Sequence, residues 1–176
     1  MKYLVFALLI FLPVWAANAQ SKRAANKRSV EKAVSKRPAA VKREKFDPLR
    51  DAAADLAASV TSASASGKRI ILDVGGEWCV WCRIMDSYFT SKPELLKLRD
   101  QNFVWLKINM SPENENRTFL SAYPKIGGYP HLFVLESDGN FLHSQDTESL
   151  ESANSYDDLK MRSFLTTWIK PKNEVH

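Results

Sequence analysis

Cys79-Val80-Trp81-Cys82 contains both cysteines of this 176-residue chain, separated by two positions. The stretch follows an apolar run, Ile70-Ile71-Leu72-Asp73-Val74, that is typical of a buried strand, and it opens a segment with helical spacing. At a helix N-terminus, unpaired backbone N–H groups and the positive end of the helix dipole favour the thiolate form of a cysteine. The sequence therefore predicts a strand, a turn and a helix, with a reactive pair of sulfurs at the turn.

The first twenty residues have the pattern of an export signal. Lys2 supplies a basic start, residues 3–17 are mostly apolar, and Ala17-Asn18-Ala19 has the small-x-small pattern of a signal peptidase site. We expect a signal peptide over residues 1–19, cleaved near Ala19, and a periplasmic or otherwise exported location. The apolar run is shorter than the ~20 residues that span a bilayer. An uncleaved membrane anchor is the alternative.

Export would place the two cysteines in an oxidising compartment, where a disulfide persists. A bond across a two-residue gap removes little entropy from the unfolded chain, so it is poorly suited to structural stabilisation and well suited to being made and broken. A zinc site would need further ligands, and the chain has only three histidines, His131, His143 and His176. We expect neither a metal nor a bound cofactor.

A basic segment precedes the expected domain. Residues 20–50 hold eleven Lys or Arg against three acidic residues, with few large apolar side chains. Such a composition buries too little apolar surface to offset the entropy of ordering, so residues 20–46 are expected to form a disordered linker. The linker either makes weak contact with an anionic membrane surface or an acidic partner, or is a soluble spacer. Nucleic acid is not expected as a partner of an exported chain.

Residues 47–172 have the size of one domain. Asp47 is expected to cap a first helix, with Pro48 in its first turn and an end within 62–67. Asp157 or Ser155 is expected to cap the last helix. Further helices are expected at 79–89, 93–99, 114–123 and 161–168, and strands at 70–74, 103–109, 131–135 and 141–143. Together they predict an α/β domain with a mixed central sheet flanked by helices on both sides.

Four features, in this order along the chain, resemble the thioredoxin superfamily, and more narrowly the exported thioredoxin-like proteins with a Trp-Cys-x-Trp-Cys motif. They are Leu72-Asp73-Val74, Glu77-Trp78-Cys79-Val80-Trp81-Cys82-Arg83, Lys107-Ile108-Asn109 and Gly128-Tyr129-Pro130. The resemblance covers most of residues 68–170 and implies a thioredoxin-like fold. It departs from the general thioredoxins at Val80-Trp81, where those carry Gly-Pro, and at Gly75-Gly76, where larger residues are usual.

The resemblance implies a role for each matched residue. Cys79 would be the exposed nucleophile that attacks a substrate disulfide, and Cys82, more buried, would resolve the mixed disulfide. Trp78 would cover the motif from the strand side. Asp73 matches a buried carboxylate beneath the second cysteine that accepts a proton from that thiol, with Lys107 as its charge partner. A polar residue at a strand end is the simpler interpretation of Asp73.

Substrate contacts are implied around the proline. Pro130 resembles the cis-proline that faces the two sulfurs, which leaves the Tyr129 backbone free to pair with an extended substrate strand; an ordinary trans proline is the alternative. Trp81 is either an exposed partner-contact surface or packs on the following helix. His131 either approaches the active site and tunes the thiolate or is a plain residue at a strand start.

The leading hypothesis is an exported thiol:disulfide oxidoreductase that reduces protein or peptide disulfides through Cys79 and Cys82 and is recharged by a membrane-linked electron donor. The direction of electron flow stays open, because the pair between the cysteines is a main determinant of reduction potential in the superfamily. The polar loop at residues 111–117 could alter partner choice. The runner-up is a non-enzymatic module that binds a peptide or envelope component.

Overall fold

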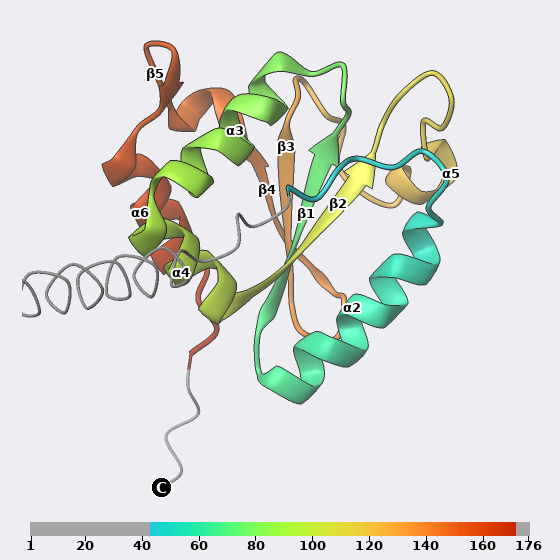
Figure 1. Ribbon diagram of the computed structural model, residues 1–176. Helices are drawn as coiled ribbons and strands as arrows, with labels where there is room; N and C mark the ends of the chain where they lie inside the picture. The colour runs from blue at the N-terminus through green and yellow to red at the C-terminus, as the bar shows by residue number, and fades with distance from the viewer. Residues whose placement is uncertain (1–42, 172–176) are drawn as a thin grey trace, which may run out of the picture. The chain divides into compact units, whose positions relative to one another are not determined.

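The computed structural model describes residues 43–171 (Figure 1). The expected signal peptide and most of the basic linker lie outside the described residues. The structure differs from the expected boundary at the start of the domain. Residues 43–46, assigned above to the disordered linker, are part of the packed unit, and the Phe46 side chain is buried against the two cysteines.

The elements alternate between helix and strand over most of the domain. In chain order they are α2 (Ala52–Ser66), β1 (Arg69–Gly75), α3 (Val80–Ser91), α4 (Pro93–Asn102), β2 (Phe103–Asn109), α5 (Arg117–Leu120), β3 (His131–Leu135), β4 (Phe141–Asp146), η1 (Thr147–Leu150), β5 (Glu151–Ser152), β6 (Ser155–Tyr156) and α6 (Asp158–Thr167).

The central sheet is mixed, with the strand order β2-β1-β3-β4. β1 pairs with β2 in parallel and with β3 in the antiparallel direction, and β3 and β4 form an antiparallel pair. β1 and β3 are almost wholly buried, and their sequences are mostly apolar. Both properties are expected for central strands that are covered on both faces. The expected mixed sheet is confirmed.

Helices cover both faces of this sheet (Figure 1). On one face, Ile71, Leu132 and Val134 pack with side chains from α3, α4 and α6. On the other face, Ile70 and Phe133 join side chains from α2 and the α5 region. Because successive side chains of a strand point to opposite faces, alternate residues of β1 and β3 serve the two cores. This alternation decides which face of the sheet each polar residue of β1 reaches.

The first helix begins later than expected. Its N-cap is Asp51, whose side chain accepts hydrogen bonds from the N–H groups of Ala53 and Ala54. Asp47 instead accepts from the Leu49 N–H in a preceding turn, and Leu49 is 92% exposed rather than part of the buried stripe. Both aspartates suit an N-cap, and local sequence does not decide between them.

Two other expectations change in detail. The helix expected at 114–123 is only the single turn α5, preceded by Asn116 at φ 47°, a left-handed conformation that prevents an earlier start. At the C-terminal helix, Asp157 is the cap, whereas Ser155 belongs to β6. No helix within residues 43–171 is long and apolar enough to cross a membrane.

Glu136 joins the end of β3 to the start of β1 and to the segment after α6. Its carboxylate accepts hydrogen bonds from Arg69 at the start of β1 (3.1 Å) and from the Ser137 N–H (3.0 Å), and it pairs with Lys170 after α6 (3.0 Å). Partial burial raises the pKa of Glu136, but these donors outweigh burial and lower the pKa to about 2.

A carboxylate with a lowered pKa stabilises the fold above its unfolded pKa of 4.5, and this contribution is lost as the pH falls towards 2. We therefore expect Glu136→Gln to lower the free energy of unfolding by about 1–2 kcal/mol at pH 7 and by almost nothing near pH 2. Urea unfolding of the variant and the native chain at both pH values measures the difference. An equal loss at both pH values would contradict the assignment to the charged form.

Candidate redox site

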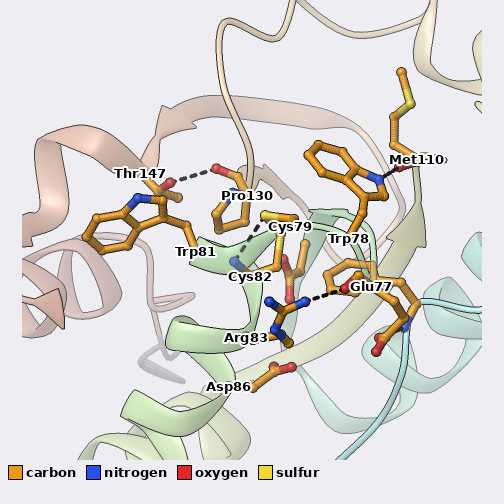
Figure 2. Close-up of a disulfide and its surroundings, with 12 residues drawn as sticks. Glu77, Trp78, Cys79, Trp81, Cys82, Arg83, Asp86, Met110, Pro130 and Thr147 are labelled. Atoms are coloured by element: carbon orange, nitrogen blue, oxygen red, sulfur yellow. Dashed lines mark hydrogen bonds between the residues drawn. A yellow bond between two sulfur atoms is a disulfide. The ribbon is translucent and has the colours of Figure 1, made fainter. Parts of the chain in front are cut away.

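The two cysteines form a disulfide at the start of α3 (Figure 2). Cys79 is the N-cap of this helix, and its sulfur accepts a hydrogen bond from the Cys82 backbone N–H at 3.1 Å. The expected position of the first sulfur at a helix N-terminus is thus confirmed. N–H donors and the helix dipole at this position stabilise negative charge on the Cys79 sulfur once the disulfide is open.

Both cysteines are buried in the disulfide form. Cys79 is 3% exposed and Cys82 1%, so the expectation that Cys79 is exposed is wrong for this state of the protein. The two residues form a small cluster with Phe46, against which Trp81 and Tyr129 pack. Neighbouring side chains therefore cover most of the surface of Cys79 in this state.

Pro130 lies beside the disulfide, between Trp78 and Trp81 (Figure 2). The Tyr129–Pro130 peptide bond is cis, as the resemblance implied, so the trans alternative is excluded. The Pro130 carbonyl accepts a hydrogen bond of 2.6 Å from the Thr147 hydroxyl, which anchors the loop to η1. The start of β3 is thereby held against η1.

The two tryptophans of the motif differ in their surroundings. Trp78 is 53% exposed; its indole N–H donates to the Met110 carbonyl at 2.7 Å, and its ring meets Tyr129 edge-on at 5.6 Å. Trp81 is half-buried and meets the ring of Tyr156 in β6 edge-on at 5.7 Å. Trp81 therefore packs on the β5–β6 hairpin, which the sequence analysis did not predict, rather than on its own helix.

Asp73 lies in a buried charge network beneath α3. The Lys107 ammonium donates to Asp73 at 2.9 Å and to Asp86 at 2.8 Å, and the Trp105 indole N–H donates to the same Asp73 oxygen at 3.1 Å. Burial lowers the pKa of Lys107, but the two carboxylates outweigh it and raise the pKa, which keeps the ammonium charged. The expected charge pair of Asp73 and Lys107 is present.

The second oxygen of Asp73, Oδ1, is buried without a hydrogen-bond partner among the described residues. A Cβ placed on Gly75, two residues along β1, would lie 2.4 Å from the Cys82 sulfur. Residues two apart on a strand face the same side, so Asp73 and the Cys82 sulfur share one face of the sheet. This arrangement agrees with a carboxylate beneath the second cysteine.

His131 points to the other face of the sheet. Its ring lies 4.8 Å from that of Phe133, and Nε2 is 2.8 Å from the Ser144 hydroxyl. Burial lowers the pKa of His131, which favours the neutral ring. The structure supports the simple interpretation of His131 as a residue at a strand start. Within residues 43–171, no three His, Cys, Asp or Glu side chains are grouped closely enough to hold a metal ion.

Comparisons of the sequence and the structure with known proteins agree with the disulfide site and the mixed sheet described above. A family model described as "Thioredoxin-like" matches residues 51–137. The chain belongs to the thioredoxin superfamily. Among solved structures, the thioredoxin-fold disulphide isomerase from Xylella fastidiosa Temecula1 aligns with a TM-score of 0.59 at 24% identity, over 72% of this chain and 98% of that one.

Several curated relatives carry the name thiol:disulfide interchange protein DsbD. The one from Pseudomonas fluorescens is 31% identical over 104 residues, which are 58% of this chain and 18% of the relative. The one from Colwellia psychrerythraea is 28% identical over 101 residues, 57% of this chain and 16% of the relative. This thioredoxin-superfamily chain thus spans less than a fifth of the curated relatives that it matches.

Three residues of the site were missed by the sequence analysis, namely Arg43, Phe46 and Asp86. Arg43 and Phe46 precede the residues matched to the thioredoxin-like family. The sequence does contain one indication that Phe46 is buried, because Phe46 is the only aromatic residue between Trp15 and Trp78. Asp86 follows Cys82 by four residues, the spacing that places two side chains on one face of a helix.

A mainly apolar cavity of about 870 Å³ opens beside the disulfide. Phe46 and Tyr129, which pack around the sulfurs, also line it, together with Trp78, Met110 and Pro112. The polar loop at residues 111–117 contributes to its rim. The Asn114 side-chain amide ties this loop to the Pro48 carbonyl at 2.9 Å. In this thioredoxin-superfamily domain the loop therefore helps to shape the surface next to the redox pair.

Proposed function

We propose that this protein is an exported thiol:disulfide oxidoreductase that reduces disulfides in other proteins. The observation that carries the proposal is the Cys79–Cys82 disulfide at the N-terminus of α3, where the Cys79 sulfur already accepts a backbone N–H. The cis-proline beside the sulfurs and the buried Asp73 support it. The curated relatives named above carry thiol:disulfide interchange in their names.

The reaction starts from the reduced dithiol. The Cys79 thiolate attacks one sulfur of a substrate disulfide, a new bond forms between Cys79 and that sulfur, and the other substrate sulfur leaves with the electron pair and takes up a proton. Donors at the start of α3 stabilise the Cys79 thiolate before the attack. The product of this step is a mixed disulfide.

Cys82 then resolves the mixed disulfide. Asp73 accepts the Cys82 thiol proton, and the resulting thiolate attacks the Cys79 sulfur, which restores the Cys79–Cys82 bond. The bond between Cys79 and the substrate breaks, and the substrate sulfur leaves as a second thiol after protonation. The substrate gains two electrons and the protein loses two. Lys107 holds Asp73 in place for this transfer through its 2.9 Å hydrogen bond.

The surface around the disulfide suits an extended substrate. Tyr129 and Pro130 end the loop before β3, where an added strand can pair with the backbone. The adjacent apolar cavity would take a side chain next to the substrate cysteine, and Trp78 and Trp81 lie on opposite sides of the redox pair (Figure 2). After each turnover the disulfide must receive two electrons, which we assign to a membrane-linked donor.

A second candidate is a non-enzymatic module that binds a peptide or an envelope component. The burial of both sulfurs in the disulfide form favours it, because a covered disulfide reacts slowly with a visiting thiol.

Equilibration with glutathione redox buffers, followed by an assay of insulin disulfide reduction, separates the two candidates. A reductase has a reduction potential that a donor in its compartment can reach, and it accelerates insulin reduction by dithiothreitol. The oxidoreductase proposal is wrong if the potential lies far below that of dithiothreitol and insulin reduction is not accelerated.

A further inference from the structure

Residues 43–46, termed the strap from here on, run across the redox site before α2 begins. The side chain of Phe46 is 2% exposed and belongs to the same buried cluster as Cys79 and Cys82. The strap lies outside residues 51–137, which match the thioredoxin-like family. It is therefore an addition to the matched domain that reaches the reacting sulfurs.

Gly75 makes room for the strap. A Cβ on this residue would lie 2.4 Å from the Cys82 sulfur and 3.2 Å from the tip of the Phe46 ring. The ring and the sulfur thus occupy space that any larger residue at position 75 would need. Phe46 fills that space from a distant part of the chain and packs where the side chain of a β1 residue would otherwise stand.

Phe46 also covers the charge network below the sulfurs. The Lys107 ammonium lies 4.1 Å from the centre of the Phe46 ring, a distance typical of a cation–π contact. Lys107 joins Asp73 to Asp86. One aromatic ring therefore packs against both the cysteine pair and the ammonium group that holds Asp73.

Ion pairs hold the strap in place. Arg43 donates to Glu77 and, at 2.9 Å, to Asp86, and the Phe46 backbone N–H donates to Glu77 at 3.0 Å. Burial raises the pKa of Glu77, but Arg43 and the Phe46 N–H outweigh it and lower the pKa, so Glu77 is ionised at neutral pH. Asp86 links the strap to Lys107, because it binds both cations.

We propose that the strap is a positioning part of the redox site, in which Phe46 shields the Cys82 sulfur so that only Cys79 can reach it. The shield reserves Cys82 for the resolving step, in which it closes the bond with Cys79 as the substrate sulfur leaves. Small thiols and oxidants are kept from Cys82 in the reduced protein. The inference deepens the proposed function and rests on it for its biological purpose, but the shielding itself can be measured without any substrate.

The test uses Cys79→Ser in the full chain, which leaves Cys82 as the only thiol. The rate of alkylation of Cys82 by iodoacetamide is compared with and without Phe46→Ala at neutral pH, under conditions where the circular dichroism of both proteins is native. We expect alkylation to become at least tenfold faster with Phe46→Ala. Phe46→Leu, which restores most of the apolar volume, should return the rate to within about threefold of the Phe46 protein.

Two control variants separate shielding from general loss of stability. Phe103→Ala removes another buried ring, at the opposite end of the sheet, and Leu49→Ala removes an exposed side chain close to the strap. Neither should accelerate alkylation more than about twofold. Equal acceleration by Phe46→Ala and Phe103→Ala would overturn the proposal, as would no acceleration by Phe46→Ala.

Should Phe46→Ala fail to fold, Arg43→Gln removes the ion pairs of the strap with Glu77 and Asp86 while the core stays complete, and it should accelerate alkylation at least threefold. An unchanged rate with Arg43→Gln would then overturn the proposal. A failure of the proposed function would be seen separately, as a native chain that does not accelerate insulin reduction.

Discussion

Cys79→Ser is expected to reduce catalysis of insulin reduction to the uncatalysed rate, whereas Cys82→Ser is expected to stop the reaction at the mixed disulfide. The two cysteines differ in position, since Cys79 is the N-cap of α3 and Cys82 lies beneath it against β1. Only Cys79 receives the N–H hydrogen bond that stabilises a thiolate there. Non-reducing electrophoresis with mass spectrometry detects the trapped species.

Ser87→Ala provides the matched control, because Ser87 is exposed on the same helix α3 and lies outside the pair between the cysteines. It should leave turnover within a few-fold of the native rate. A Cys79→Ser protein that still accelerates insulin reduction would refute the assignment of the nucleophile. A mixed disulfide trapped on Cys82 in that variant would mean that the roles are reversed.

Lys107→Met is expected to have the largest effect on stability. Lys107 is the cation between two carboxylates, and its side chain is 5% exposed. Its removal leaves Asp73 as a buried charge without an ionic partner, while Asp86 keeps Arg43. Loss of one partner from a buried pair costs about 3–5 kcal/mol. The midpoint of urea unfolding at pH 7 measures this loss.

Two comparisons make this prediction specific. The double variant Asp73→Asn/Lys107→Met removes the buried charge as well, so it should be more stable than Lys107→Met alone. Lys92→Met breaks a more exposed pair with Asp158 and should lower the free energy of unfolding much less than Lys107→Met does. Equal losses of stability in Lys92→Met and Lys107→Met would contradict the prediction that the buried network stabilises the fold more than an exposed ion pair does.

The pH dependence of Lys107 has a definite sign. Its pKa is raised above the ordinary 10.5, so the ion pair stabilises the fold fully from neutral pH up to about 10.5, and this contribution is lost as the pH rises through the raised pKa. The difference between the native chain and Lys107→Met is therefore expected to be constant around neutral pH and to shrink in strongly alkaline solution.

Much of the fold could be predicted from the sequence because its strong signals are local. The apolar runs of β1, β2 and β3 and the spacing of α3 and α6 each lie within a single segment, and the structure contains all five. The cis bond at Pro130 and the pair of Asp73 with Lys107 were also predicted, although only through the resemblance of four ordered motifs. Each of these motifs is itself a short run of neighbouring residues.

The rest depends on contacts between distant residues. Phe46 packs with Cys82, which lies more than thirty residues later in the sequence. The sequence neighbours of Phe46 are mostly basic or small residues, and such a composition predicts disorder. The short strands β5 and β6 are two residues each, too short to show alternation, so the surface on which Trp81 packs could not be predicted. The burial of Cys79 likewise follows from side chains that converge on it from separate loops.

The early start of the packed unit affects how this protein is shortened for experiments. A fragment cut at residue 51, where the match to the family begins, would lack Arg43 and Phe46. It would leave a hole beside Gly75 and deprive Glu77 and Asp86 of their shared arginine. Such a truncation is expected to melt at a lower temperature, and activities measured on it would describe an incomplete catalyst; recombinant versions should begin before Arg43.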